Sequence, residues 1–280
     1  RNIGSMKNDG IEFGVNVANI GNDVFSWSGL FNFSYNRNQV LRLIGGADIY
    51  SGATIIREGE PVGSFWGFQH LGTWSTADEA EAKKYNMLPG DVRYQDINGD
   101  GVINDNDKTI IGRGIPDGYG TFSNTFKYKN LSLLIDLQYM FGNDVIDRSI
   151  HSAEDRQGIA NSYKTVLNAW TESNQNTPIA QVRPINAYYT TNNDSHKVSD
   201  ASFIRGRNLM LSYTLNPDVV SRMKLDRLRF FASVHNFFVI TKYAGYDPEV
   251  SNSGSAFDQG FGLYDYPRPR VFTLGLNIGL

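Results

Sequence analysis

The 280-residue sequence contains no cysteine, which excludes disulfide bonds, thiolate metal sites and cysteine nucleophiles. It has no run of about 18 apolar residues, so no segment could cross a membrane as a helix. The formal net charge of −3 gives no electrostatic reason to expect nucleic acid as a partner. No signal peptide opens the sequence at Arg1, so we expect a mature or partial chain.

The usual patterns of enzyme active sites are missing too. There is no P-loop and no Gly-x-Ser-x-Gly nucleophile elbow. The four histidines are scattered, and none forms a metal-binding pair at helical spacing: His70, His151, His196 and His235. Neighbouring carboxylates lie in polar segments and are expected to face solvent: Glu79, Glu81, Glu154 and Asp155. We therefore expect a protein that is not an enzyme.

Aromatic residues and glycine are abundant instead, with 17 Phe, 15 Tyr, 4 Trp and 28 Gly, a mixture that favours strands and tight turns. Several segments alternate apolar and polar residues with the period of a two-faced strand. These are 10–20, 25–36, 120–128, 131–141, 209–215, 226–240 and 271–280, with a further possible strand at 62–74. Short helices are expected at 76–85 and 217–224, and helical spacing also occurs within 151–172.

Alternation alone does not say what the apolar faces meet. In a soluble sandwich they meet a second sheet, and in a membrane barrel they meet lipid. Strands of about ten to fifteen residues are longer than usual and suit a tilted barrel wall. Tight turns at 21–23 and 129–130 alternate with very long connections at 37–118, 144–200 and 242–269, as in outer-membrane barrels. We expect an all-β, antiparallel transmembrane β-barrel with long loops and short helices.

Eight or nine such strands can be counted, which could close a small barrel by number. The chain starts almost directly in a strand, however. We therefore expect the wall to be incomplete and to pair with strands outside this sequence, because an open edge in lipid leaves backbone groups unsatisfied.

One long connection contains a calcium-type loop, at 91–112. Side-chain oxygens of Asp96, Asn98 and Asp100 stand at positions one, three and five of a twelve-residue frame, and Gly101 follows at position six. The remaining ligands of the frame are the Val102 carbonyl, Asn104 through water, and Asp107 at position twelve, where Glu is usual. The alternative is a plain turn, since Asn-Gly and Asp-Gly are both strong turn dipeptides. We predict a bound Ca²⁺.

Tyrosines in two other long loops are candidates for stacking on sugar rings: Tyr188, Tyr189, Tyr264 and Tyr266. Packing among the loops is the alternative explanation.

Several motifs resemble SusC/RagA-type TonB-linked (TonB-dependent) outer-membrane transporters of Bacteroidetes. The most specific is PGDVRYQDINGDGVINDND at 89–107, followed by IIG at 110–112 and PD at 116–117. Others are NIGSMKNDGI at 2–11, FNFSYN at 31–36, YMFGND at 139–144, AWT at 169–171, SFIR at 202–205, NLMLSY at 208–213, VHNF at 234–237 and TKYAGYDPE at 241–249. The resemblance covers essentially the whole chain.

The resemblance implies a 22-stranded barrel with an N-terminal plug, of which residues 1–280 would be the C-terminal segment. It implies import of a bulky glycan, oligosaccharide or peptide across the bacterial outer membrane. It also implies a SusD-type surface lipoprotein as partner, a TonB complex that binds parts outside this chain, and a dimer of transporter–lipoprotein pairs. One departure is the end at Gly279-Leu280, where such barrels commonly carry an aromatic residue.

The alternative from another class is a soluble or surface-displayed β protein that is stapled by calcium and binds glycans or mediates adhesion. The two readings differ in what the apolar strand faces touch.

Overall fold

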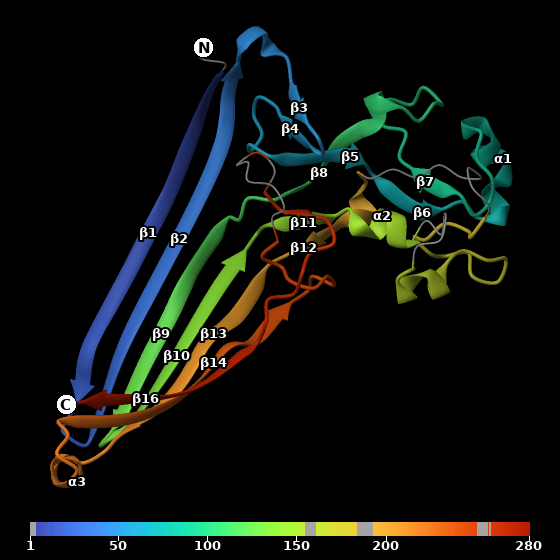
Figure 1. Ribbon diagram of the computed structural model, residues 1–280. Helices are drawn as coiled ribbons and strands as arrows, with labels where there is room; N and C mark the ends of the chain where they lie inside the picture. The colour runs from blue at the N-terminus through green and yellow to red at the C-terminus, as the bar shows by residue number, and fades with distance from the viewer. Residues whose placement is uncertain (1–3, 155–160, 184–192, 251–256, 258) are drawn as a thin grey trace.

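The computed structural model describes residues 4–154, 161–183, 193–250, 257 and 259–280. Its main feature is an antiparallel sheet of seven long strands, hereafter the wall, in the order β1-β2-β9-β10-β13-β14-β16. Figure 1 shows these strands side by side, with shorter elements attached at one end. The wall strands are β1 (Gly4–Gly21), β2 (Phe25–Leu43), β9 (Gly118–Tyr128), β10 (Leu131–Phe141), β13 (Phe203–Thr214), β14 (Arg227–Thr241) and β16 (Val271–Gly279).

The register of the wall brings the apolar faces of its strands together. Phe122 of β9 pairs with Phe31 on one side and with Leu137 on the other. Farther along β10, Ile135 pairs with Leu209 of β13, which in turn pairs with Val234 of β14. Every wall strand therefore contributes to one continuous apolar side, hereafter the apolar face.

The apolar face stays open. Near the end of the chain, Phe272 is 73% exposed and Leu274 86% exposed. The smaller sheets of the described residues are built around other strands, and their buried clusters do not include the central residues of the wall. The described chain thus leaves a broad apolar surface to be covered by something else.

One polar pair interrupts the apolar face. The indole Nε1 of Trp27 donates a hydrogen bond of 3.0 Å to Asn124 Oδ1, which lies on the same side of the sheet. Gly29 makes this contact possible, because a Cβ added there would lie 2.7 Å from the Trp27 ring. The amide oxygen is therefore satisfied without water.

The opposite side of the wall, hereafter the polar face, carries hydrophilic side chains. Asn32 Nδ2 of β2 donates to Thr121 Oγ1 of β9, and Arg229 of β14 donates to Ser212 of β13. Asp136 and Gln138 lie on the same side of β10. The alternation in the sequence predicted such a sheet, with one apolar and one polar face.

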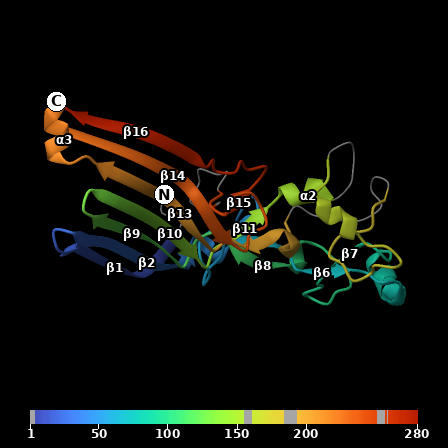
Figure 2. The same cartoon turned by 90° about the horizontal axis from the view of Figure 1, so that it is seen from below.

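The two ends of the wall differ in their connections. At one end, Asn22 and Lys129 lie in tight hairpins, and the short helix α3 (Pro217–Arg222) joins β13 to β14. At the other end, long segments connect β2 to β9, β10 to β13 and β14 to β16. Figure 2, seen from below, shows the lobe formed by these segments extending away from the strands. The expected asymmetry between short and long connections is confirmed.

The long connections form a loop lobe with three small sheets. One contains β3 (Ile49–Ser51), β4 (Thr54–Ile56), β5 (Ser64–Phe68) and β8 (Lys108–Arg113), and another pairs β6 (His70–Thr73) with β7 (Val92–Tyr94). The third contains β12 (Val198–Asp200), β11 (Asp144–Asp147) and β15 (Phe261–Gly262). Phe65, Phe68 and Ile146 are almost completely buried between them. The expected strand at 62–74 is thus β5 and β6 of the lobe, so the wall has seven strands rather than eight or nine.

The helices are short. The expected helix at 76–85 is the 3-10 turn Thr76–Asp78, α1 (Glu79–Ala82) and the 3-10 turn Lys83–Tyr85. Further 3-10 turns are Ile44–Gly46, Asp105–Asp107 and Ser195–Lys197. None of the helices in the described residues is long and apolar enough to cross a membrane.

The helix expected within 151–172 is largely wrong. The described residues form only α2 (Ser149–Glu154) and a 3-10 turn at Lys164–Asn168. The chain then becomes extended at Ala169, and the backbone N–H of Trp170 donates to the carbonyl of Ile179. Trp170 is buried in the lobe without being part of a helix. Tertiary packing therefore explains the apolar residues whose spacing suggested a helix.

Candidate functional site

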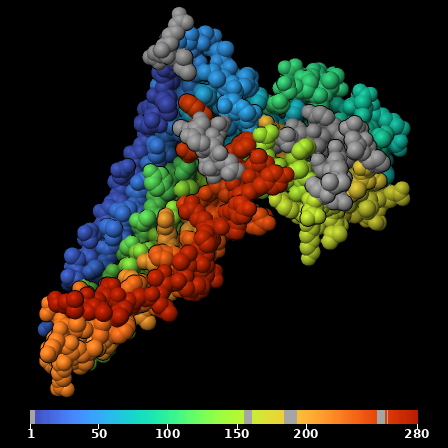
Figure 3. Space-filling model, in the orientation of Figure 1, coloured from blue at the N-terminus to red at the C-terminus, as the bar shows by residue number. Residues whose placement is uncertain are grey.

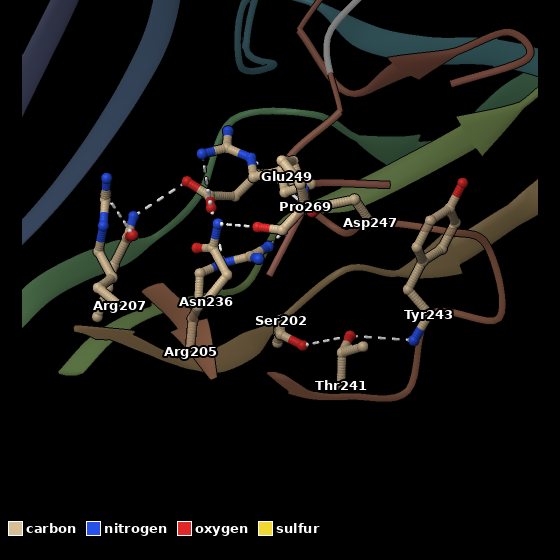
Figure 4. Close-up of polar contacts among 11 residues, drawn as sticks. Ser202, Arg205, Arg207, Asn236, Thr241, Tyr243, Asp247, Glu249 and Pro269 are labelled. Atoms are coloured by element: carbon tan, nitrogen blue, oxygen red, sulfur yellow. Dashed lines mark hydrogen bonds and ion pairs between the residues drawn. The ribbon is translucent and has the colours of Figure 1, made fainter. Parts of the chain in front are cut away.

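The segment after β14 folds back over the polar face of the wall. The Thr241 hydroxyl donates to the carbonyl of Ser202 and accepts the N–H of Tyr243, which turns the chain inward at the end of β14. Farther on, Asn236 of β14 donates to the carbonyl of Pro269 just before β16. Figure 4 shows these contacts, with charged residues grouped around the contact between Asn236 and Pro269.

This cluster, hereafter the Arg205 cluster, consists of Arg205, Arg268, Asp247 and Glu249. Arg205 of β13 donates to Asp247 Oδ1 at 2.6 Å, and its Nε lies 3.0 Å from Glu249 Oε2. Arg268 lies 3.8 Å from Asp247 Oδ2 and 3.5 Å from Glu249 Oε2. Two cations and two anions thus meet in one place, and their formal charges cancel.

Arg205, Asp247 and Glu249 of the cluster are largely buried, Arg268 is exposed, and the cluster is anchored to the wall. The side chains of Arg205 and Asp247 are 3% and 6% exposed, so each would be costly to desolvate without its partner. Gln138 of β10 donates to Glu249 Oε1 and accepts from Arg207. The segment is therefore tied to two neighbouring wall strands by charge-assisted hydrogen bonds.

A large cavity lies between this segment and α2. Its volume is about 1050 Å³, and its lining includes Tyr264 and Tyr266, two of the tyrosines proposed from the sequence. The structure adds Tyr163, Tyr243 and Tyr246 to the lining. Tyr188 and Tyr189 lie outside the described residues. Hereafter we call this the tyrosine cavity.

The calcium-type loop is held by its own carboxylates. Asp96 accepts the N–H groups of Gly99 and Gly101 at 2.7 and 2.9 Å, and the Gly101 N–H is the main cause that lowers the pKa of Asp96. Asn98 Oδ1 accepts from the N–H of Asp100, and Asp100 Oδ1 from that of Val102. The side chains at positions one, three and five therefore each accept at least one backbone N–H of the loop.

Position twelve has a different setting. Asp107 is completely buried, and its two oxygens accept the N–H groups of Ile97 and Asn104, both at 2.9 Å. Asn104 in turn caps the following turn through the N–H of Asn106 and donates to the Val102 carbonyl. Among the described residues no three His, Asp or Glu side chains stand close enough together to hold a metal ion. Asp96, Asn98 and Asp100 remain predicted ligands of a cation, while Asp107 is engaged as an internal cap.

Two histidines that are far apart in the sequence meet in the lobe. The rings of His70 and His196 are 5.1 Å apart between centroids, and His196 Nε2 lies 2.7 Å from Glu154 Oε2. Burial lowers the pKa of His70 to about 4, although nearby Asp194 opposes the shift. The expectation that Glu154 faces solvent is wrong, since its side chain is only 11% exposed. Its partner comes from a distant segment, so spacing along the chain could not reveal the contact.

The residues that hold these sites together were mostly missed by sequence reasoning. Arg205, Asp247 and Glu249 belong to the SFIR and TKYAGYDPE motifs, but the motifs did not indicate that the two segments touch. The one signal in the sequence was a pair of arginines, Arg205 and Arg207, just before the alternating segment 209–215. Tyr243 of the tyrosine cavity also lies in the TKYAGYDPE motif, whereas Asp147 had no distinguishing signal.

Comparison with known proteins gives the family. No family model matches the sequence. The chain is 32% identical over 318 residues to TonB-dependent receptor P39 of Formosa agariphila, covering 99% of this chain and 30% of that protein. It is 27% identical over 293 residues to the TonB-dependent receptor SusC of Bacteroides thetaiotaomicron, covering 99% of this chain and 27% of SusC. The chain therefore spans about three tenths of the length of the curated relatives it matches.

Solved structures agree. The chain superimposes on part of the RagAB peptide transporter with a TM-score of 0.80 and 26% identity, covering 99% of this chain and 29% of that one. A second structure, the RagAB peptide importer in the closed-closed state, gives a TM-score of 0.78 over 100% of this chain. These relatives are named receptors and transporters rather than enzymes.

The antiparallel wall, the few short helices and the whole-length similarity identify this chain as a homologue of part of the barrel of SusC/RagA-type TonB-dependent receptors.

Proposed function

We propose that this chain is the C-terminal barrel segment of an outer-membrane importer that is energised through TonB. The observation that carries the proposal is the open apolar face, which runs across all seven wall strands. An eleven-residue strand such as β10 is about 36 Å long and, tilted by about 45°, spans about 25 Å, the height of the apolar band of an outer-membrane barrel. Lipid is a suitable cover for such a face.

The other features of the chain agree with this assignment. The polar face would line the wet interior of the barrel, and the loop lobe would lie at the outer surface. Both edges of the wall, β1 and β16, pair with one neighbour each within the sheet. Further strands would satisfy their backbone groups in lipid, since open edges do not occur there.

The cargo would be a bulky nutrient, either a glycan or oligosaccharide or a peptide. SusC and the RagAB peptide transporter support this range through their names. A SusD-type lipoprotein would close the outer mouth, and the assembly would be a dimer of transporter–lipoprotein pairs. The TonB complex would contact parts of the protein outside this chain, as would the plug.

Calcium would stiffen the loop lobe. Oxygens of Asp96, Asn98 and Asp100 and the Val102 carbonyl would hold the ion, and Asn104 would reach it through water. Asp107 would either complete the site or remain the internal cap that it is here. A loop ordered in this way would present the lobe to a partner at lower entropic cost.

The test is fractionation of the native cells, followed by gels of unboiled and boiled samples and mass spectrometry of the bands. We expect this chain in the outer membrane, within a much larger heat-modifiable species and together with a lipoprotein. A free soluble or secreted protein of 31.3 kDa would refute the importer. The calcium-stapled β protein that binds glycans or mediates adhesion would then replace it.

A further inference from the structure

The tyrosine cavity lies in the path that the proposed importer would offer its cargo. It is bounded by α2, by the residues that follow β14 and by those between β15 and β16. The Arg205 cluster fixes the segment after β14 to the polar face, so the cavity lies on that side of the wall. Figure 3 shows the two segments that bound it, the red one before β16 and the yellow-green one around α2, beside each other.

Its aromatic lining is graded from floor to rim. Tyr243 is buried, Tyr163 is partly exposed, and three further tyrosines are largely exposed: Tyr246 at 69%, Tyr264 at 64% and Tyr266 at 92%. Tyr264 is held in place, because its N–H donates to Ser149 Oγ and its hydroxyl contacts Ser152. Open tyrosine rings around a cavity are available to a ligand rather than used in a core.

Carboxylates outnumber cations in its lining. The described residues that line it include Asp147 and Asp265, and also Glu154, which is paired with His196, while Lys164 is the one lysine or arginine. Asp147 is buried and lies on the floor, where it accepts from the N–H of Ser149 and from the hydroxyl of Tyr243. The cavity therefore has a negative potential that bulk water screens only in part.

The tyrosines report the same potential. Burial raises the pKa of Tyr243, and the charges of Asp147 and Asp265 raise it further. Burial also raises the pKa of Tyr163, with Asp147 again adding to the effect. The part of these shifts that comes from Asp147 and Asp265 shows negative charge close to the rings, and this charge would attract a cation.

We propose that the tyrosine cavity binds a cationic group carried next to a flat or ring-shaped face. An ammonium or guanidinium is attracted both by the carboxylates and by the faces of the tyrosine rings. Two kinds of cargo share this chemistry, a basic oligopeptide and an oligomer of an amino sugar. This inference rests on the proposed import function and narrows its cargo, since an acidic ligand would meet the negative charges of Asp147 and Asp265.

The test is calorimetric titration of the full-length receptor, purified in detergent, with charged and neutral probes of matched shape. Tri-arginine is compared with its citrulline analogue, and the glucosamine trimer with the N-acetylglucosamine trimer. We expect the charged member of at least one pair to bind at least tenfold more tightly than the neutral one. Its affinity should fall as the salt concentration rises, because screening weakens the attraction. Which pair responds tells whether peptides or amino sugars are the cargo.

Two variants locate the binding. Replacing Tyr246 with Ala should weaken the charged probe about fivefold, because one cation–π contact is lost. Its side chain is largely exposed, so folding is not at risk. The matched control is Tyr50→Ala, which removes a tyrosine of similar exposure, 62%, from β3, away from the cavity.

Equal binding of charged and neutral probes would overturn the inference, as would no binding of either charged probe. Equal weakening by Tyr246→Ala and Tyr50→Ala would overturn it too. Each of these results can occur in a receptor that sits in the outer membrane with its lipoprotein, so the import proposal and the cargo inference can fail separately.

Discussion

A charge placed on the apolar face gives the sharpest test of what that face touches. Ile135 is the fifth residue of β10, about 13 Å along the strand from Leu131 at a rise of about 3.3 Å per residue. With a tilt of about 45° this is about 9 Å along the membrane normal, close to the middle of an apolar band about 25 Å tall. Lys at this depth should cost about 2–4 kcal/mol, or roughly 30- to 700-fold in the folding equilibrium.

The matched control lies one residue away. Leu134 of β10 pairs with Thr125 and Met210 and points to the polar face. Ile135→Lys and Leu134→Lys therefore introduce the same charge at nearly the same depth on opposite sides of one strand. The assay is urea titration of the full-length receptor into lipid vesicles, with the heat-modifiable band on unboiled gels as the measure of folded barrel.

We expect Ile135→Lys to fold at much lower urea concentrations only, or to fail to insert, while Leu134→Lys stays within about 1 kcal/mol of the unmodified protein, since surface and lumen substitutions are mild. Equal costs for the two variants would refute the assignment of the apolar face to lipid. A larger cost for Leu134→Lys would show that the polar face, and not the apolar face, meets lipid.

Three further predictions concern the lobe and its attachment. Arg205→Gln leaves Asp247 buried without its main partner, so the segment after β14 should detach at a cost of about 3 kcal/mol and become sensitive to protease, whereas Arg207→Gln should not have this effect. Equal protease resistance of both variants would count against the attachment. His70 has a pKa lowered to about 4, so the unfolded lobe binds more protons than the folded one below pH 6.5, and stability falls as the pH drops from about 6.5 to about 4, by up to about 3 kcal/mol. Hydrogen exchange of the lobe at pH 5 and pH 7.5 measures this, and a His70→Phe variant with the same pH dependence would contradict it. Removing calcium with a chelator should expose the loop of Asp96 and Asp100 to protease. The variant with both Asp96→Ala and Asp100→Ala should be cleaved with or without chelator. If the chelator does not change cleavage of the unmodified protein, the prediction of a bound ion is wrong.

The wall could be predicted from the sequence because its strands and tight turns are determined by residues that are close together in the chain. Each strand repeats every two residues, and the tight turns carry Asn22 and Lys129 between strands that follow one another. The register then follows from aligning apolar faces, as Phe31 with Phe122 and Leu137 shows. The same regularity did not reveal the number of wall strands, since β5 and β6 also alternate but pair inside the lobe.

The sites were harder to predict because they join segments that are far apart in the sequence. His196 meets Glu154 across 42 residues, and Arg205 meets Asp247 across the same separation. No spacing rule applies to such pairs. Tyr264 and Tyr266 were named as candidates because they lie in a long loop, and the structure places both in the lining of the cavity, whereas Asp147 looks like any other strand residue.

The position of Trp27 on the apolar face allows tryptophan fluorescence to report on that face. Of the four tryptophans, Trp27 alone belongs to the wall, while Trp66, Trp74 and Trp170 lie in the loop lobe. Brominated acyl chains quench indole emission only at contact range. In the proposed membrane setting they should therefore quench the fluorescence of Trp27 and not that of the other three tryptophans. The chain thus carries separate fluorescent reporters of its wall and of its loop lobe, without any label.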